Sequence, residues 1–193
     1  GIAEGLLVPV LCGSATNNSG IDLLLNTILD YLPSPDRCPP VAGKSPKDGS
    51  KTERKAGDNN ALSSLVFKTV ADPYAGKLTL FRVFSGSFKA DSTIYNASKD
   101  TQERVGQIFL LQGKKQVPVP EIFEGDMGTV PKLKVTTTGD SLTDPANGIL
   151  FDPIDFPKPV LSLALVPKTR GDEEKISNAL ARLTEEDPSL TVE

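Results

Sequence analysis

The pair Gly76-Lys77 is the feature of this sequence that comes nearest to a phosphate-binding motif. A P-loop needs a glycine five residues before that pair, and a Ser or Thr directly after the lysine to reach Mg²⁺. Ala71 and Leu78 occupy these two positions, and the chain has no Asn-Lys-x-Asp base-recognition motif. We therefore expect no complete nucleotide site in this chain.

Residue types exclude other catalytic chemistries. The chain has no histidine, which removes Ser-His-Asp and Cys-His arrangements and the commonest zinc ligand. Cys12 and Cys38 lack the C-x-x-C spacing of a metal site, so we expect two reduced thiols. Adjacent carboxylates on a helix point to different faces and cannot flank one substrate atom. We expect both such pairs, Glu173/Glu174 and Glu185/Glu186, to be solvated, and we expect no catalytic residue, metal or cofactor.

The charge pattern allows a local site for anions. The net charge of −4 and the pI of about 5.0 argue against attraction of nucleic acid by the whole surface. Basic residues nevertheless outnumber acidic ones over 61–115, whereas acidic residues dominate 151–193. This asymmetry permits a basic face toward phosphates, with an evenly scattered soluble surface as the alternative. The candidate phosphate contacts are Lys89, Lys99, Arg104, Lys114 and Lys115.

Residues 61–155 predict an antiparallel β-barrel. A turn at 72–76 opens into a strand that carries apolar side chains on both faces, which places it in the middle of a sheet. Strand patterns cover 62–70, 77–86, 92–96, 105–112 and 128–133, separated by turn residues and without a helical period. Regular short strands of this kind favour a barrel. Phe81, Phe84, Phe88 and Tyr95 fall inside the strands, so core packing is preferred over base stacking.

Residues 1–33 predict an incomplete α/β piece. The apolar run 6–12 predicts a buried strand, and apolar residues at helical spacing predict a helix from Ile21 to Leu32 that ends at Pro33. Asn18 or Ser19 is a candidate cap for this helix. One strand and one helix cannot enclose a core.

Residues 34–60 are rich in proline and predict an extended connector with a mobile middle. Basic residues in this stretch could form an arm that seeks phosphate. Acidic residues alternate with them, so a solvated linker is preferred. The basic members are Lys44, Lys47, Lys51, Arg54 and Lys55, and the acidic members are Asp48, Glu53 and Asp58.

Residues 156–193 predict an incomplete α+β piece. A strand is expected over 160–166, followed by a helix over 172–186 whose apolar residues Ile176, Ala179, Leu180 and Leu183 share one face. We expect both ends of the chain to self-associate or to be digested more readily than the barrel, because their apolar helix faces have no complete domain to cover them. The first residue is Gly1 and the only methionine is Met127, so we expect the chain to be part of a longer protein. No stretch approaches the apolar length needed to span a bilayer.

Several runs occur in the order found in a known family. LVFKTVADPYAGKLTLFRVFSGSF, ERVGQI, EGDMGTV and TTTGDSL resemble the second domain of bacterial elongation factor G, the ribosomal translocation GTPase. PVLCGSA resembles the end of its G domain, and ALVPKTRGDEEKISNALARLTEEDPSLTVE resembles the opening of its third domain. The GDEEKIS run is more similar to the second, paralogous form of the factor.

The resemblance implies a translation-factor barrel (61–155) between the tail of a G domain (1–33) with its linker (34–60) and the start of a ferredoxin-like third domain (156–193). Ser14 and Ala15 would contact the guanine base, while GTP and Mg²⁺ would be held by the parent protein. The barrel would dock on small-subunit ribosomal RNA, in the cytoplasm, with no membrane or DNA partner. The alternatives are a ribosomal protection or ribosome-rescue GTPase of the same family, and a stand-alone β-barrel interaction module without GTPase activity.

Overall fold

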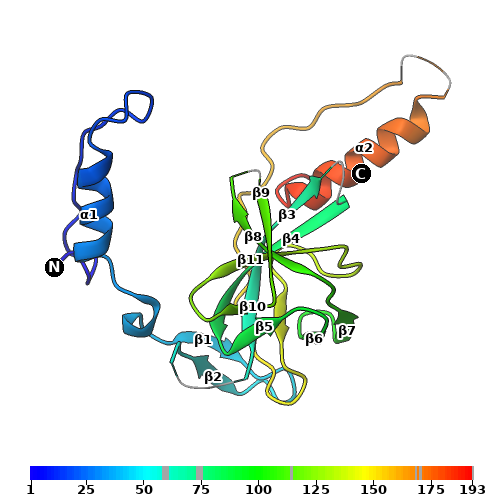
Figure 1. Ribbon diagram of the computed structural model, residues 1–193. Helices are drawn as coiled ribbons and strands as arrows, with labels where there is room; N and C mark the ends of the chain where they lie inside the picture. The colour runs from blue at the N-terminus through cyan, green and yellow to red at the C-terminus, as the bar shows by residue number, and fades with distance from the viewer. Residues whose placement is uncertain (58–60, 73–75, 114, 168, 170, 193) are drawn as a thin grey trace. The chain divides into compact units, whose positions relative to one another are not determined.

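The computed structural model describes residues 1–57, 61–72, 76–113, 115–167, 169 and 171–192. The chain divides into two compact units, Gly1–Pro39 and Pro40–Glu193. Figure 1 shows the order of the helices and strands along the chain.

The first unit contains the helix α1 (Ile21–Tyr31) and a 3-10 turn η1 (Pro35–Arg37). The predicted helix is confirmed, but its predicted cap is wrong. Gly20 holds the cap position with a φ of 76°, and no side chain caps the helix. A Cβ at Gly20 would lie 2.7 Å from the Cys12 carbonyl oxygen, so only glycine fits this turn.

The apolar run 6–12 is not a strand, so that prediction is wrong. Val10 is 87% exposed, and α1 has no buried residue. A strand needs a neighbour for its backbone hydrogen bonds, and no described strand pairs with this run. Cys12 and Cys38 are both free thiols.

The second unit begins with a hairpin of β1 (Val41–Lys44) and β2 (Lys51–Arg54). β1 also pairs antiparallel with β13 (Leu150–Phe151), so the hairpin is joined to the end of the barrel. The interpretation of 34–60 as a connector is therefore wrong for 41–54. The backbones of β1 and β13 approach each other closely at Gly43, where a Cβ would lie 2.7 Å from the Leu150 carbonyl oxygen.

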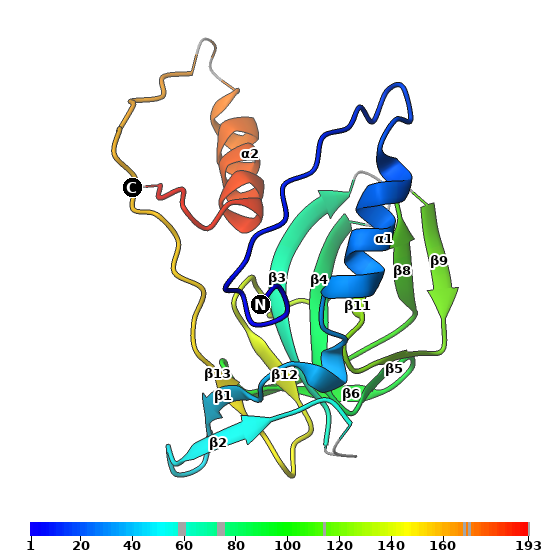
Figure 2. The ribbon, with the colours of Figure 1, turned by 90° about the vertical axis from the view of Figure 1, so that its left-hand side faces the viewer.

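The barrel consists of an antiparallel sheet of eight strands in the order β7-β6-β12-β3-β4-β11-β8-β9, with a two-stranded sheet β10-β5 beside it. Figure 2 shows β3, β4, β11, β8 and β9 side by side. The predicted antiparallel, mainly β fold is confirmed. The strands are β3 (Ser63–Asp72), β4 (Gly76–Ser85), β5 (Ser87–Lys89), β6 (Thr93–Asn96), β7 (Thr101–Arg104), β8 (Ile108–Gln112), β9 (Lys115–Val119), β10 (Glu121–Phe123), β11 (Met127–Pro131) and β12 (Ser141–Thr143).

The core draws side chains from β6 and β8, the second strand from each end of the sheet order, so the sheet curves around one apolar interior. Phe81 and Phe88 are fully buried, and their rings stack with centroids 4.0 Å apart. Gly128 packs against Phe81 and Ile122, and a Cβ there would lie 2.9 Å from Phe81 Cζ. The buried cluster comprises Val66, Phe81, Val83, Phe88, Ile94, Val105, Ile108, Ile122, Val130, Leu133 and Leu142.

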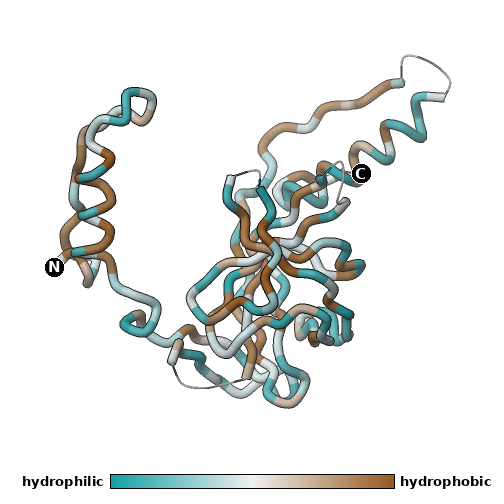
Figure 3. Tube along the Cα trace, in the orientation of Figure 1, coloured by the Kyte–Doolittle hydropathy of each residue, from teal (hydrophilic) through white to brown (hydrophobic). Residues whose placement is uncertain are grey.

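Residues 156–166, which precede the last helix, are solvent-exposed and belong to no helix or strand. The strand predicted over 160–166 is wrong, since the structure assigns no strand there and Val160 is 100% exposed. Figure 3 shows this stretch as a largely apolar chain between β13 and α2. The predicted helix is confirmed as α2 (Glu173–Glu186).

The C-terminal end of α2 contacts β3 of the barrel. The Thr69 hydroxyl donates to the Glu185 carbonyl, the Ala71 N–H donates to the Glu186 carboxylate, and Lys77 Nζ lies 3.7 Å from Glu185 Oε1. The expectation that Glu185 and Glu186 are only solvated charge is therefore wrong.

We expect limited proteolysis to leave a resistant core of about residues 40–155. The first unit has a helix without buried residues, and residues 156–166 are exposed, so both open to a protease more readily than the barrel. Mass spectrometry of the fragments identifies the cut sites. Early cleavage inside β3 or β4, or equal resistance along the whole chain, contradicts this expectation.

Candidate functional site

The candidate cations are distributed over different strands of the barrel. Arg104 lies on β7 and Lys115 on β9, the first and last strands in the sheet order, and both are exposed. Lys89 lies on β5, with a side chain 65% exposed and its Nζ 3.6 Å from Glu121 Oε1. An exposed ion pair of this kind contributes little energy, so Lys89 remains available to contact a phosphate. Lys114 lies outside the described residues.

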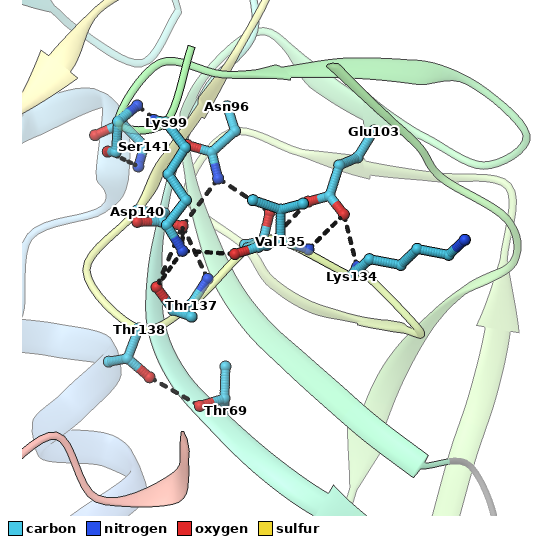
Figure 4. Close-up of polar contacts among 12 residues, drawn as sticks. Thr69, Asn96, Lys99, Glu103, Lys134, Val135, Thr137, Thr138, Asp140 and Ser141 are labelled. Carbon is cyan, nitrogen blue, oxygen red and sulfur yellow. Dashed lines mark hydrogen bonds and ion pairs between the residues drawn. The ribbon is translucent and has the colours of Figure 1, made fainter. Parts of the chain in front are cut away.

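Lys99 has an internal role. Its side chain is 31% exposed, and its Nζ lies 3.1 Å from Asp140 Oδ2. The same Nζ donates to the Val135 carbonyl and to the Thr137 hydroxyl, the latter at 2.7 Å. Figure 4 shows these contacts converging on the loop that follows β11. Lys99 therefore fixes residues 132–140 rather than projecting freely into solvent.

Glu103 on β7 anchors the same loop from the other side. One carboxylate oxygen accepts the backbone N–H groups of Lys134 and Val135 at 2.6 and 2.9 Å. The other accepts the N–H of Thr136 at 3.0 Å and also its hydroxyl. Burial raises the pKa of Glu103, but the combined hydrogen bonds outweigh it, so the net pKa is lowered. Glu103 is an anion at neutral pH that organises three successive backbone donors.

Asn96 completes this network inside the barrel wall. Its side-chain NH₂ donates to Thr136 Oγ1 at 3.1 Å and to Asp140 Oδ2 at 2.9 Å, and its oxygen accepts the N–H groups of Ser98 and Lys99. A buried amide with its donors and acceptor all used is rigidly oriented. The loop is therefore held in one conformation.

The fixed loop carries two exposed lysines that the sequence reasoning missed. Lys132 begins it with a φ of 63° and donates its N–H to the Lys77 carbonyl, and Lys134 follows two residues later. The sequence offered only a polar T-T-T-G-D run as a signal. The partners that hold this run in place lie on β6 and β7, more than 30 residues away along the chain.

Ser14 and Ala15 lie in a small loop of the first unit. The Ser14 N–H donates to the Ser19 carbonyl at 2.9 Å, and the Ser19 N–H donates back to the Ser14 carbonyl at 3.0 Å. The Ser14 hydroxyl oxygen accepts the Asn17 N–H at 3.3 Å, and Ala15 is exposed. The loop is closed on itself, and its role toward a base stays a prediction.

The described residues do not fit a complete GTP and Mg²⁺ site. Gly76-Lys77 begins the strand β4, and Lys77 is paired with Glu185, whereas a P-loop lysine lies in a loop that opens a helix. In the described part of the chain, no group of three or more His, Cys, Asp or Glu side chains is placed to hold a metal ion. None of its helices is both long and apolar enough to cross a bilayer.

Comparison with known proteins matches two successive parts of the chain to family models. Residues 61–145 match the family model for elongation factor G domain 2, and residues 156–193 match that for elongation factor G domain III. The chain belongs to the elongation factor G family. A protein of Thermus thermophilus, known from its crystal structure, is similar over 90% of this chain, with 29% identity and a TM-score of 0.69. This chain covers 24% of the length of that protein.

In elongation factor G terms, the Glu103 network belongs to domain 2. Asn96, Lys99, Glu103 and the loop 132–140 all fall within the matched range 61–145. The helix α2 falls within the range matched by domain III. The contacts of Glu185 and Glu186 with β3 therefore join parts of the two matched domains.

Proposed function

We propose that this chain is part of an elongation-factor-G-like GTPase that promotes GTP-dependent translocation on the ribosome. The observation that carries the proposal is the succession of domain 2 and domain III matches in one chain. GTP and Mg²⁺ are held by another part of the longer protein, to which Ser14 and Ala15 contribute contacts with the base. The protein works in the cytoplasm.

The role of the barrel in this proposal is to dock on small-subunit ribosomal RNA. Arg104, Lys115 and Lys89 supply exposed positive charge on the barrel, and Lys132 and Lys134 add to it from the loop fixed by Glu103. RNA phosphates attract such side chains through the release of condensed counterions, which makes the binding salt-dependent. An acidic chain can bind RNA in this way because the attraction is local.

We expect the triple variant Lys89→Glu/Arg104→Glu/Lys115→Glu to bind small ribosomal subunits at least about 10-fold more weakly, a loss of about 1.4 kcal/mol. For this variant, the logarithm of the binding constant falls less steeply with the logarithm of the salt concentration, because fewer counterions are released. Filter binding or sedimentation at several salt concentrations measures both quantities.

The matched control for this variant is Lys158→Glu/Lys175→Glu/Arg182→Glu, which makes the same charge change on exposed residues outside the barrel. We expect it to retain most of the affinity. An equal loss from both variants would show that only net charge matters, and it would remove the barrel as the docking surface.

A further inference from the structure

The hairpin β1–β2 and residues 146–148 border a cavity of about 460 Å³. Figure 2 shows the hairpin beside the loop that leads from β12 into β13. The volume lies within the range of about 300–1,000 Å³ that is usual for ligand sites. Three cationic residues, Lys47, Lys51 and Arg54, line the cavity, and none of its described lining residues is Asp or Glu.

Arg54 is held in place entirely by neutral oxygens. Its Nη2 donates to the Asn147 carbonyl at 2.8 Å, and its Nη1 donates to Thr52 Oγ1 at 3.1 Å and to the Glu53 carbonyl at 3.0 Å. Its Nε is buried and has no hydrogen-bond partner among the described residues. Buried polar groups nearly always have a partner, so this donor indicates a missing acceptor.

Lys47 is similar, since its Nζ donates to the Ala146 carbonyl at 3.2 Å. Within the described chain, no ion pair joins Lys47, Lys51 or Arg54 to a carboxylate. The three positive charges of the cavity are therefore not neutralised by the described part of the protein.

Two acidic residues that alternate with these cations in the sequence, Asp48 and Glu53, do not line the cavity, and the third, Asp58, lies outside the described residues. Glu53 is exposed and lies between Thr52 and Arg54 on a strand, so it faces the opposite side from these two lining residues and the same side as Lys51. Asp48 accepts the Ser50 N–H at 3.1 Å and the Ser50 hydroxyl at 2.8 Å. Hydrogen bonds from Ser45 and Ser50 lower the pKa of Asp48 to about 2, so this carboxylate stays ionised and bonded to its own turn.

We propose that this cavity binds a phosphate group. A guanidinium offers a planar fork of donors and an ammonium a compact charge, and both suit phosphate oxygens. Ser45, Ser50 and Thr52 line the same space. The source of the phosphate rests on the proposed function. It is an RNA backbone if the barrel docks on ribosomal RNA, and a free nucleotide is the other source of the same chemistry.

The test is a titration of the ¹⁵N-labelled chain with inorganic phosphate at constant ionic strength, observed at the Arg54 Nε–H resonance. The expected result is a saturable shift that chloride does not reproduce. Lys51→Gln removes an exposed charge from the lining and should weaken phosphate binding at least about 5-fold. Lys44→Gln is the matched control, because Lys44 pairs with Lys51 across the hairpin, is exposed and does not line the cavity.

Arg54→Gln should abolish the binding. If that variant loosens the hairpin, the comparison of Lys51→Gln with Lys44→Gln still tests whether phosphate binds in the cavity. A shift that is linear in phosphate concentration, or an equal effect of these two lysine variants, overturns the proposal.

Competition then identifies the source. A short oligoribonucleotide that displaces phosphate at a lower total phosphate concentration than a nucleoside monophosphate supports an RNA backbone, and the reverse order supports a nucleotide. The titration contains no ribosome, so a missing shift overturns the phosphate cavity and leaves the ribosomal proposal standing. A chain that binds phosphate but not small subunits overturns the ribosomal proposal instead.

Discussion

Replacing Phe81 with alanine lowers the free energy of unfolding of the barrel by about 3–5 kcal/mol, the range observed for buried aromatic truncations. Phe81 is fully buried, stacks on Phe88 and closes the space beside Gly128. The surrounding strands pair on both sides of β4, so they cannot move inward enough to fill the gap. Because a domain of this size has only about 5–15 kcal/mol in total, the variant is close to unfolded at physiological temperature.

Urea unfolding followed by circular dichroism measures this loss. We expect the slope of the free energy of unfolding against urea concentration to be the same for the variant and the wild type. Phe123→Ala is the control, because Phe123 is 59% exposed and its truncation opens no cavity. A loss below about 1 kcal/mol for Phe81→Ala would mean that the two rings do not form the centre of the core.

Replacing Glu103 with alanine is expected to destabilise the barrel by roughly 2–5 kcal/mol, because two or more buried donors lose their partner at about 1–3 kcal/mol each. The affected donors are the N–H groups of 134–136 and the Thr136 hydroxyl. Hydrogen exchange should speed up at these three amides first. Gln102→Ala is the control, since Gln102 is the exposed neighbour on the same strand.

The same carboxylate makes stability depend on pH. The pKa of Glu103 is lower in the folded protein than its ordinary value of 4.5, so the unfolded chain takes up the proton first as the pH falls. The stabilisation by ionised Glu103 is fully present above about pH 5. It is lost as the pH falls below about 4.5 and through the lowered pKa of the folded state. Glu103→Gln should remove this part of the acid dependence, whereas Glu53→Gln, at an exposed position, should leave it intact. Identical pH profiles for wild type and Glu103→Gln would contradict the role of the anion.

Some elements could be predicted from the sequence because their information is local. The strand β4 carries apolar side chains on both faces, and α1 and α2 repeat apolar residues at the helical period. Turn residues separate the strands, so the barrel could be predicted from spacing alone. The order of several runs, each weak by itself, was enough to indicate the elongation factor G family.

Elsewhere the sequence was insufficient because a strand needs a partner as well as a pattern. The runs 6–12 and 160–166 have the apolar composition of strands but pair with no described strand. The proline-rich stretch after α1 lacks that composition, yet 41–54 forms a hairpin, whose first strand also pairs through Gly43 and Lys44 with Phe151 and Leu150, more than 100 residues later. Local composition carries no information about such a distant neighbour.

The candidate site shows the same division at the level of side chains. The sequence identified Lys99 and Arg104 equally as basic residues of the barrel, and only the fold placed Asp140 beside the first and left the second exposed. In the sequence, Lys51, Glu53 and Arg54 alternate in charge, which predicted that the charges cancel. In the structure, strand pleating turns Glu53 away from Arg54. The sequence by itself therefore determined the residue types, the barrel and the family. The tertiary structure decided which charges are paired, because pairing depends on side-chain direction and on contacts between distant segments.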